Sequence, residues 1–407
     1  MSGPPDETRQ PEVSRRLAAM PPYPLAEVPI IKRRLLAEGV DVIDLGAGDN
    51  DMPPPGPVVE ALREAALDPR FSKYGFQQGL PEFRRAAADY LARRFGHRFD
   101  PDTEVLPLLG SKEGLAHLPA AFVNPGEVVI VPEPGYQGYL GGALLSDAER
   151  RVVPLEAEGG FLLELESLPA GVLARSRVAY VNYPNNPTAA VAGLDYLERL
   201  VGVARRHGIL IAYDNAYCDL TYDGYQAPSI FDVAGARDVA LEFFSLSKSF
   251  SMTGWRLGFV VGRRELIGAL TRIKTYVDTG PFLAVQAAGA VALDRAEEFV
   301  APVRDTLRRR RDAGVQALVE QGFEVDSPRA AMYLWIPVGI PAGSRDFARV
   351  ALEREGVVVL PGRGFGPAGE GYFRIALTVE PPRLVEAIGR LGRVRSGWEA
   401  RPTIASV

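Results

Sequence analysis

The stretch RVAYVNYPNNPTAAVAGLDYLERLVGVARRHGILIAYDNAY, residues 177–217, decides the fold. Two short runs rich in Val, Ile and Tyr, at 177–184 and 209–217, flank a segment of helical spacing that ends in Gly208, a common helix stop. Neither run shows the regular alternation of a half-exposed strand, and such runs are typical of strands buried on both faces of a parallel sheet. The stretch therefore predicts a strand–helix–strand unit of a layered α/β domain.

The same pattern continues on both sides of this stretch. Further apolar runs lie at 127–134, 239–248 and 257–262. Helical patterns separate several of the runs, so we predict a large α/β domain over residues 46–280.

The order of elements changes after about residue 300. Helices predicted at 303–321 and 345–355 are mixed with short apolar runs and show no strict alternation, which indicates a smaller α+β domain. We assign residues 16–45 and 281–407 to this small domain. Residues 1–15 are polar and rich in proline, and we expect them to form a flexible tail.

Composition excludes several classes of partner. The net charge of −5 argues against nucleic acid, because binding phosphates needs a basic face. No stretch reaches the roughly 18 apolar residues of a membrane span. One cysteine and three scattered histidines exclude an internal disulfide and predict no metal site. We therefore expect a soluble, cytoplasmic protein. The basic run LRRRRD at 307–312 is interpreted as the solvated face of a helix.

Polar residues follow four of the predicted strands, at the edge where α/β sheets bind ligands. Lys248 ends the run at 239–248, although only five of the 46 basic residues in the chain are lysine. An amine can lose its proton and form a Schiff base, whereas a guanidinium cannot, so Lys248 is a candidate nucleophile as well as a possible surface charge. The nearby Ser245, Ser247 and Arg256 are suited to binding an anion.

Other strand ends offer matching groups. Asp214 ends a buried strand, where a carboxylate needs a cation or hydrogen-bond donors, and its alternatives are a structural ion pair or a helix cap. Tyr217 lies three residues further on, and two prolines hold Asn186 in an extended segment. Gly110, Ser111 and Lys112 begin a predicted helix, whose free N–H groups suit a phosphate or are simply capped. Tyr136 lies in a turn, and Arg374 follows a glycine-rich loop, where it could grip a carboxylate.

Taken together, these motifs resemble those of the class I/II aminotransferases, which belong to the fold-type I enzymes that use pyridoxal 5'-phosphate (PLP). The resemblance covers residues 24–395. The segments that carry it furthest, toward the LL-diaminopimelate aminotransferase branch, are GLPEFRRAAADYLARRFG, LPLLGSKEGLAHLPAAFVNPG, NYPNNPT, SKSFSMTGWRLGF and KTYVDTGPFLAVQAAG. It implies a large domain with a mostly parallel, seven-stranded sheet between helices, and a smaller α+β domain.

The resemblance also implies a role for each motif. Lys248 would hold PLP as a Schiff base and carry a proton. Asp214 would pair with the pyridine nitrogen of the cofactor. Tyr217 and Asn186 would contact the ring hydroxyl oxygen, and Tyr136 would stack on the ring. The residues implied for the phosphate are Ser111, Lys112, Ser245, Ser247 and Arg256, with Tyr74 of the partner subunit. Arg374, Asn186 and Ala47 would contact the substrate. The expected protein is a homodimer with shared sites that exchanges an amino group between an amino acid and a 2-oxo acid, with LL-diaminopimelate and 2-oxoglutarate as candidate substrates.

Alternatives within the same scaffold are an aminotransferase for alanine, aspartate, methionine or an aromatic amino acid, and a C–S lyase. A transcription regulator with an aminotransferase-like domain is disfavoured, because only about 25–45 residues precede that domain and the chain is acidic. Three positions depart from the pattern: Ala189 where glycine is common, Asn50 where proline is common, and Gln77 where some diaminopimelate enzymes carry glutamate.

Overall fold

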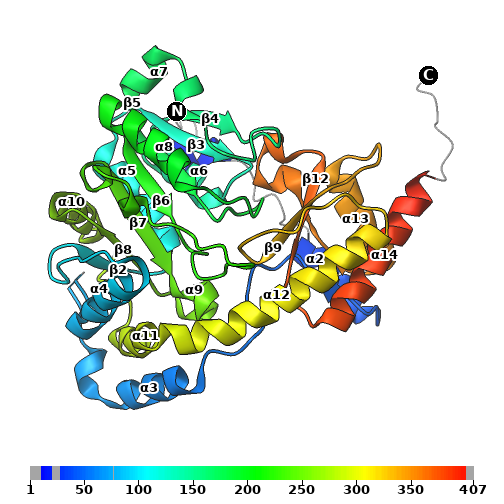
Figure 1. The fold of residues 1–407 in the computed structure, drawn as a ribbon, viewed down its shortest axis with the longest axis horizontal. Helices are drawn as coiled ribbons and strands as arrows, with labels where there is room; N and C mark the ends of the chain where they lie inside the picture. The colour runs from blue at the N-terminus through cyan, green and yellow to red at the C-terminus, as the bar shows by residue number, and fades with distance from the viewer. Residues whose placement is uncertain (1–10, 21–27, 77, 400–407) are drawn as a thin grey trace, which may run out of the picture.

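The computed structural model describes residues 11–20, 28–76 and 78–399, and it divides into two units around two separate sheets (Figure 1). The large unit contains a seven-stranded sheet. Its strands, in spatial order, are β2 (Val105–Leu108), β8 (Gly258–Gly262), β7 (Ala240–Ser245), β6 (Leu210–Asp214), β5 (Ser176–Asn182), β3 (Val128–Glu133) and β4 (Glu149–Pro154). Only β8 runs antiparallel to its neighbours among these strands, so the predicted mostly parallel sheet is confirmed.

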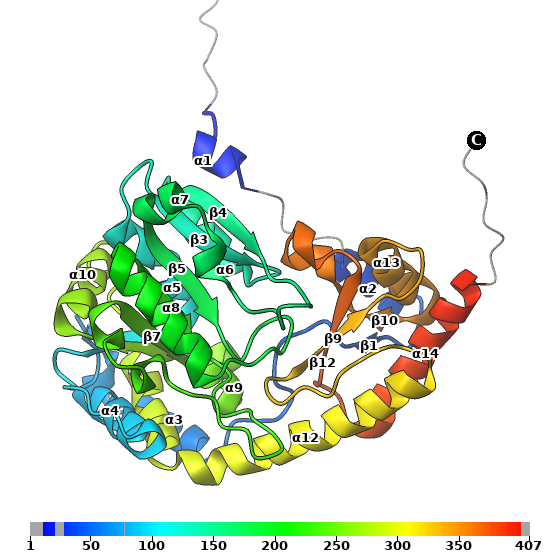
Figure 2. The ribbon, with the colours of Figure 1, turned by 45° about the horizontal axis from the view of Figure 1, so that its top comes forward.

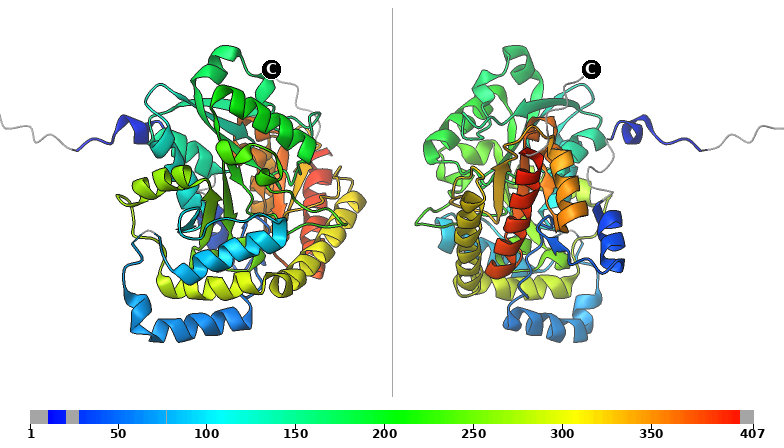
Figure 3. Two further views of the ribbon diagram at one scale, coloured as in Figure 1. Left: turned by 60° about the vertical axis from the view of Figure 1, so that its left-hand side comes forward. Right: turned by 90° about the vertical axis from the view of Figure 1, so that its right-hand side faces the viewer.

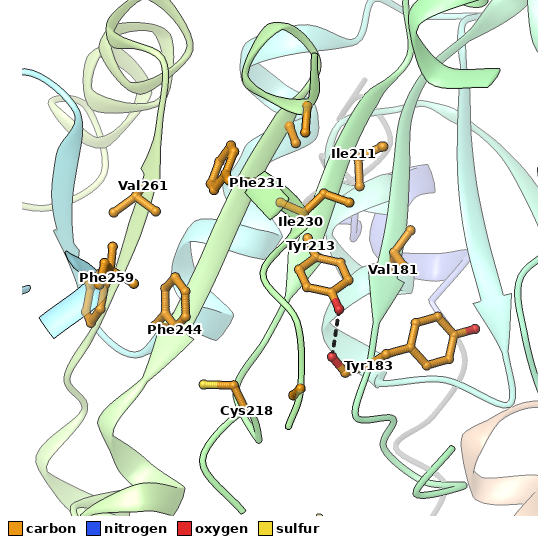
Figure 4. Close-up of a cluster of buried hydrophobic side chains, with 14 of the residues drawn as sticks. Val181, Tyr183, Ile211, Tyr213, Cys218, Ile230, Phe231, Phe244, Phe259 and Val261 are labelled. Carbon is orange, nitrogen blue, oxygen red and sulfur yellow. Dashed lines mark hydrogen bonds between the residues drawn. The ribbon is translucent and has the colours of Figure 1, made fainter. Parts of the chain in front are cut away.

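Helices cover both faces of this sheet, because each strand sends alternate apolar side chains to opposite sides. One face packs against α5 (Ser111–Phe122), α6 (Gln137–Leu145) and α10 (Arg264–Lys274). The other face packs against α4 (Pro81–Phe95), α8 (Leu194–His207) and α11 (Leu283–Asp294). Figure 4 shows the second face, where Phe244 and Phe259 stack and the Tyr213 hydroxyl donates to the carbonyl of Tyr183 at 3.0 Å.

Helix α8 illustrates how the sequence sets an element. Its apolar residues recur at helical spacing, and the buried ones include Tyr196, Leu197, Leu200 and Val201. Gly208 ends the helix in the left-handed conformation with φ of +66°, which glycine adopts without steric cost. Helix α8 thus lies between β5 and β6 and stops at Gly208, as the strand–helix–strand prediction requires.

The small unit contains a three-stranded antiparallel sheet, packed on helices. Its strands are β11 (Leu360–Pro361), β12 (Tyr372–Ala376) and β9 (Tyr333–Pro337). Its helices are α2 (Val28–Ala37), α13 (Ser344–Glu355) and α14 (Pro381–Glu399), and a short parallel pair joins β1 (Ile43–Asp44) to β10 (Val357–Val358). This mixture agrees with the predicted α+β class, while the domain boundaries given above stay a prediction.

The long helix α12 (Ala296–Glu320) runs along both units (Figures 1 and 2). Phe299 and Val300 pack in the core of the large unit, and Leu307 and Leu318 pack in the core of the small unit. The helix begins seven residues before the predicted start at 303 and continues through Pro302, although proline removes one helical hydrogen bond. Burial of the residues on either side offsets that loss.

The basic run at 307–312 corrects one expectation. Arg308 and Arg309 are exposed, as expected for a solvated face, but Arg310 and Arg311 are buried, so that interpretation is wrong for half of the run. Arg310 pairs with Asp51 and Glu380 at 2.6 Å each, and Arg311 pairs with Asp223 and Asp312. Buried guanidinium groups need such partners, and carboxylates distant in sequence supply all of them here except the neighbouring Asp312.

The periphery contains two smaller features. Helix α1 (Arg15–Ala18) projects from the large unit (Figure 2). It contacts the end of α6, where Arg16 donates to the carbonyl of Leu145 at 3.4 Å. Residues 1–10 of the predicted tail lie outside the described residues. Helix α3 (Gly56–Leu67) lies along α11 at the edge of the large unit (Figure 3). Among the helices in the described ranges, none combines the length and the apolar character that a bilayer crossing requires.

A carboxyl group in the middle of the large sheet predicts an unusual pH dependence of stability. Glu242 on β7 is 1% exposed, and it accepts hydrogen bonds from Asn215 Nδ2 at 2.7 Å and Ser229 Oγ at 2.5 Å. Burial raises its pKa from 4.5 to about 8. The folded protein therefore holds a proton that the unfolded chain loses, so the contribution of Glu242 to stability is full below pH 4.5 and is lost as the pH rises through about 8.

Glu242→Gln removes this titration while keeping the side chain's size and one acceptor oxygen. The free energy of unfolding of the variant, measured by urea denaturation, should therefore rise relative to wild type between about pH 5 and about pH 9. A difference between the two proteins that stays constant over this range would contradict the assigned titration.

Candidate active site

A cavity of about 470 Å³ opens at the carboxyl ends of β5, β6 and β7, between the two units. It collects groups from segments that are far apart in the chain. The sequence-predicted residues that line it are Ala47, Ser111, Lys112, Tyr136, Asn186, Asp214, Tyr217, Ser245, Ser247, Lys248, Arg256 and Arg374. Parallel strands bring these groups together because their carboxyl ends meet at one edge of the sheet.

Asp214 is the most constrained of these groups. It ends β6, it is buried, and its Oδ2 accepts a hydrogen bond from the Tyr139 hydroxyl at 2.7 Å. Its Oδ1 is buried with no hydrogen-bond partner among the described residues. Burial raises the pKa of Asp214 to about 6, while the bonds from Tyr139 and the backbone of Ala216 lower it. An unpaired carboxylate oxygen next to a cavity is suited to a cationic or N–H group of a bound molecule.

Lys248 lines the same cavity but lies on the short helix α9 (Leu246–Ser249). The predicted strand at 239–248 is therefore too long, because β7 ends at Ser245. Ser245 caps this helix by accepting the N–H of Ser247 at 3.2 Å, which sets the direction of the first turn. The Lys248 amine is partly buried and donates to the carbonyl of Gly48, in the segment that follows β1. Among the described residues, no carboxylate forms a salt bridge with it.

One end of the cavity forms an anion-binding arrangement, which we name the phosphate cup: Gly110, Ser111, Lys112, Ser245, Ser247 and Arg256. Helix α5 begins at Ser111 without a side-chain cap, so its first N–H groups are available to an anion. Gly110 has φ of +73°, and a Cβ atom there would collide with the guanidinium of Arg256. Arg256 is fixed in turn by donating to the carbonyl of Thr253 at 2.9 Å.

The other end contains a buried arginine. Arg374 on β12 donates to Asn186 Oδ1 at 2.7 Å and to the carbonyl of Gly46 at 3.0 Å, and its guanidinium carbon lies 4.1 Å from the centre of the Tyr333 ring. No carboxylate within the described ranges forms a salt bridge with Arg374, and its Nε has no hydrogen-bond partner there. A buried guanidinium without a counter-ion can bind a carboxylate from outside the protein.

Three functional candidates were missed by the sequence analysis. Tyr139 lies one helical turn after Tyr136, on the same face of α6, and this i+3 spacing was the available signal. Asn182 donates to the backbone of Asp214 at 2.7 Å and accepts the N–H of Asn186 at 2.8 Å, so it joins two strand ends. Tyr333 shares a hydrogen bond of 2.9 Å with the Tyr217 hydroxyl, and no local pattern marks it.

The remaining predicted positions have different surroundings. Tyr74 does not line the cavity and is 70% exposed. Asn50 donates to Ser251 Oγ at 2.9 Å. Ala189 has φ of +58°, a region that favours glycine, which accounts for glycine at this position in many sequences of the resembling family. Gln77 lies outside the described residues.

Comparisons with known proteins agree with this arrangement. The family model for aminotransferase class I and II matches residues 40–391. A curated LL-diaminopimelate aminotransferase from Desulforudis audaxviator is 46% identical over 378 residues, covering 93% of this chain and 96% of that protein. The solved structure of a probable N-succinyldiaminopimelate aminotransferase from Thermus thermophilus is 38% identical, with a TM-score of 0.86 over 90% of this chain and 98% of that chain. A single mutant of Thermus thermophilus aspartate aminotransferase is 31% identical, with a TM-score of 0.88 over 95% of this chain and 100% of that one.

Proposed function

Because the chain belongs to the class I and II aminotransferase family, we propose that it binds PLP in this cavity and transfers the amino group of LL-diaminopimelate to a 2-oxo acid, with 2-oxoglutarate as the acceptor. The observation that carries the proposal is one cavity lined by a partly buried amine, Lys248, and a buried carboxylate with a free oxygen, Asp214. The substrate is inferred from the curated relatives, several of which are 44–46% identical.

The residues of the cavity fit PLP group by group. The phosphate cup offers helix N–H groups, hydroxyls and a guanidinium to a dianion. Asp214 Oδ1 would accept a hydrogen bond from a protonated pyridine nitrogen, and its burial strengthens that interaction. Tyr217 and Asn186 would contact the ring hydroxyl, and Tyr136 offers an aromatic face for stacking. When bound, PLP supplies an electron sink for the bonds at the substrate α-carbon.

Lys248 has two tasks in this proposal. Its amine would hold the cofactor when that is bound, and as a free base its Nζ would accept a proton from the substrate α-carbon and return it at another atom.

Arg374 and Asn186 would bind the substrate α-carboxylate. Arg374 donates to Asn186 now, and the planar guanidinium can exchange these bonds for the two oxygens of a carboxylate. Ala47, next to Gly46, lines the same end of the cavity and leaves room for the substrate side chain. Arg374 comes from β12 of the small sheet and Asn186 follows β5 of the large sheet, so a carboxylate bound by both would contact both units.

We also propose a homodimer in which Tyr74 completes the partner's phosphate cup. Tyr74 and Phe76 support this proposal, because both are exposed and large aromatic side chains gathered at a surface mark interaction sites. The loop that carries them lies next to the start of α11, since a Cβ atom on Gly75 would meet the side chain of Leu283, and Phe282, the N-cap of that helix, is exposed as well.

Mixing two inactive variants tests this sharing. Lys248→Ala and Tyr74→Ala homodimers are combined and allowed to exchange subunits at limiting PLP. If Tyr74 serves the partner's site, each hybrid dimer contains one site with both residues intact, and activity appears on mixing. If Tyr74 serves its own subunit, no hybrid site is complete and no activity appears.

A panel of amino donors tests the proposed reaction. Each amino acid is added to the purified holoenzyme, and the conversion of bound PLP to its pyridoxamine form is followed by absorbance. We expect conversion by LL-diaminopimelate and glutamate, but not by alanine or methionine. Conversion by aspartate, alanine or an aromatic amino acid instead would assign another donor. Release of pyruvate and ammonia from a sulfur amino acid would identify a C–S lyase.

Tyr139→Phe tests the hydrogen bond to Asp214. The Tyr139 hydroxyl lowers the pKa of Asp214, so its loss should raise that pKa above about 6 and remove the side-chain donor to Oδ2. Because a protonated Asp214 cannot attract a cationic ring, PLP affinity near neutral pH should fall about tenfold, which corresponds to roughly 1.4 kcal/mol.

The measurement is the dissociation constant of PLP as a function of pH. The midpoint of the pH profile should move to higher pH in the variant. Tyr180→Phe is the matched control, because Tyr180 stacks on Tyr139 and donates to the carbonyl of Leu115 without touching Asp214. An unshifted midpoint in Tyr139→Phe would remove Tyr139 from this role.

A further inference from the structure

A second lysine is buried behind the phosphate cup. Lys274, the last residue of α10, is 0% exposed, and it is one of only five lysines in the chain. Its Nζ lies 2.7 Å from Glu113 Oε2, and 2.9 Å and 3.1 Å from the two carboxylate oxygens of Asp278. Since a buried ammonium is costly unless fully partnered, this arrangement is built around Lys274.

Glu113 connects this lysine to the cup. It lies in the first turn of α5, two residues after Ser111, and its Oε2 accepts the backbone N–H of Leu109 at 3.3 Å. His117 Nδ1 lies 2.9 Å from the other oxygen, Oε1. Although burial raises the pKa of Glu113, the bonds to His117 and Lys274 lower it below the usual value, so Glu113 is ionised at neutral pH. The Glu113 carboxylate therefore ties the backbone at Leu109, just before the phosphate cup, to the first turn of α5.

The chemistry of the cluster requires a compact cation. Ligand-type atoms of Glu113, His117 and Asp278 lie within 4.8 Å of one another, and the Lys274 ammonium supplies positive charge between the two carboxylates. An ammonium has three donors on one atom, which match the three carboxylate oxygens around it, whereas a planar guanidinium needs more space. Asp278 also accepts the N–H of Gly280 at 2.7 Å, so the cluster holds a second loop.

We propose that Lys274 is a positioning residue for the cofactor phosphate: through Glu113 it holds the Leu109–Gly110–Ser111 backbone in the geometry that the phosphate needs. The inference rests on the proposed PLP function. Lys274 lies outside the cavity lining, so it acts on the phosphate only through Glu113 and the backbone. Its effect is therefore on the phosphate and not on the ring, which contacts other residues.

Comparing the binding of PLP with that of pyridoxal distinguishes an effect on the phosphate from a general loss of stability. Apoenzyme is titrated with PLP and with pyridoxal, which has the same ring and aldehyde but no phosphate, and binding is followed by absorbance and tryptophan fluorescence. In Lys274→Met, the dissociation constant of PLP should rise about 30-fold while that of pyridoxal changes less than about twofold. The preference of the enzyme for PLP over pyridoxal, which is the ratio of the two dissociation constants, should therefore fall by at least about 15-fold.

Arg311→Met is the matched control, since Arg311 is a buried cation that pairs with Asp223 and Asp312, and it does not line the cavity. It should retain the wild-type preference for PLP even if it lowers the melting temperature. If Lys274→Met weakens PLP and pyridoxal by equal factors, or weakens neither, the proposal is wrong.

Two further variants keep the test decisive if Lys274→Met does not fold. Glu113→Gln removes the charge that Lys274 holds and should reduce the preference for PLP as Lys274→Met does. Asp278→Asn removes the other carboxylate, which does not touch the cup, and should leave the preference within about twofold of wild type. Equal effects of the two variants would overturn the proposed path through Glu113. Failure of the wild-type apoenzyme to bind PLP at all would instead refute the proposed function.

Discussion

Replacing Lys248 by alanine should abolish transamination and leave PLP bound only noncovalently. The variant keeps the phosphate cup, Asp214 and Arg374, so it should still bind PLP and the amino donor. It lacks the one amine in the cavity that can both hold the cofactor and carry the α-proton. We expect kcat to fall by at least about 10⁴-fold, since loss of a nucleophile that also acts as the base costs of that order or more.

Two controls define the role of Lys248. Lys248→Arg keeps the positive charge but cannot act as a nucleophile, so it should be as inactive as the alanine variant. Added methylamine should restore part of the activity to Lys248→Ala by supplying a free amine in the space left by the side chain. Turnover of Lys248→Ala at the wild-type rate would refute the assignment, and recovery in the arginine variant would show that charge alone is sufficient.

Asp214→Asn should produce the second largest loss. An amide has nearly the size of the carboxylate and can still accept the hydrogen bond from Tyr139, but it cannot stabilise a proton on the pyridine ring. Without that proton the ring is a weaker electron sink. We expect kcat/KM to fall by about 10³-fold, or roughly 4 kcal/mol, because the lost interaction joins two buried charges.

The pH dependence of PLP binding gives an independent readout for Asp214. In the wild-type apoenzyme the pKa of Asp214 is about 6, because burial opposes its ionisation, so its negative charge is lost as the pH falls through about 6. PLP affinity should therefore weaken below that pH in wild type but not in Asp214→Asn. Asp219→Asn is a matched control, since Asp219 is buried but bonds to Tyr90 and Arg94 outside the cavity. An identical pH profile in Asp214→Asn and wild type would contradict the proposed pairing.

The sequence predicted the elements of the large unit because local patterns determine them. The run at 209–217 and the helix ending at Gly208 need only buried apolar residues and a left-handed stop. The same patterns placed Asp214 at the end of a strand and Lys248 three residues beyond the end of the next one, and the geometry of a parallel sheet then brought them to one edge. The gathering of these groups could be predicted without knowing any contact between side chains.

Contacts between distant segments could not be predicted in this way. Tyr333 reaches Tyr217 from a strand that is 116 residues further along the chain, and Arg310 finds Asp51 across 259 residues. Nothing near Arg310 in the sequence distinguishes it from the exposed Arg309. The burial of a charge depends on which carboxylates the tertiary fold brings to it, and that information is spread over the whole chain.

Helix α12 has a mechanical consequence. Its first turns are embedded in one hydrophobic core and its later turns in the other, so the two units cannot move apart without exposing apolar side chains to water. A stiff rod that is anchored at both ends permits a hinge-like swing and resists separation. We therefore expect the cavity to open by rotation of the small unit relative to the large unit. Arg374 would move with the small unit, while Asp214 would stay with the large one.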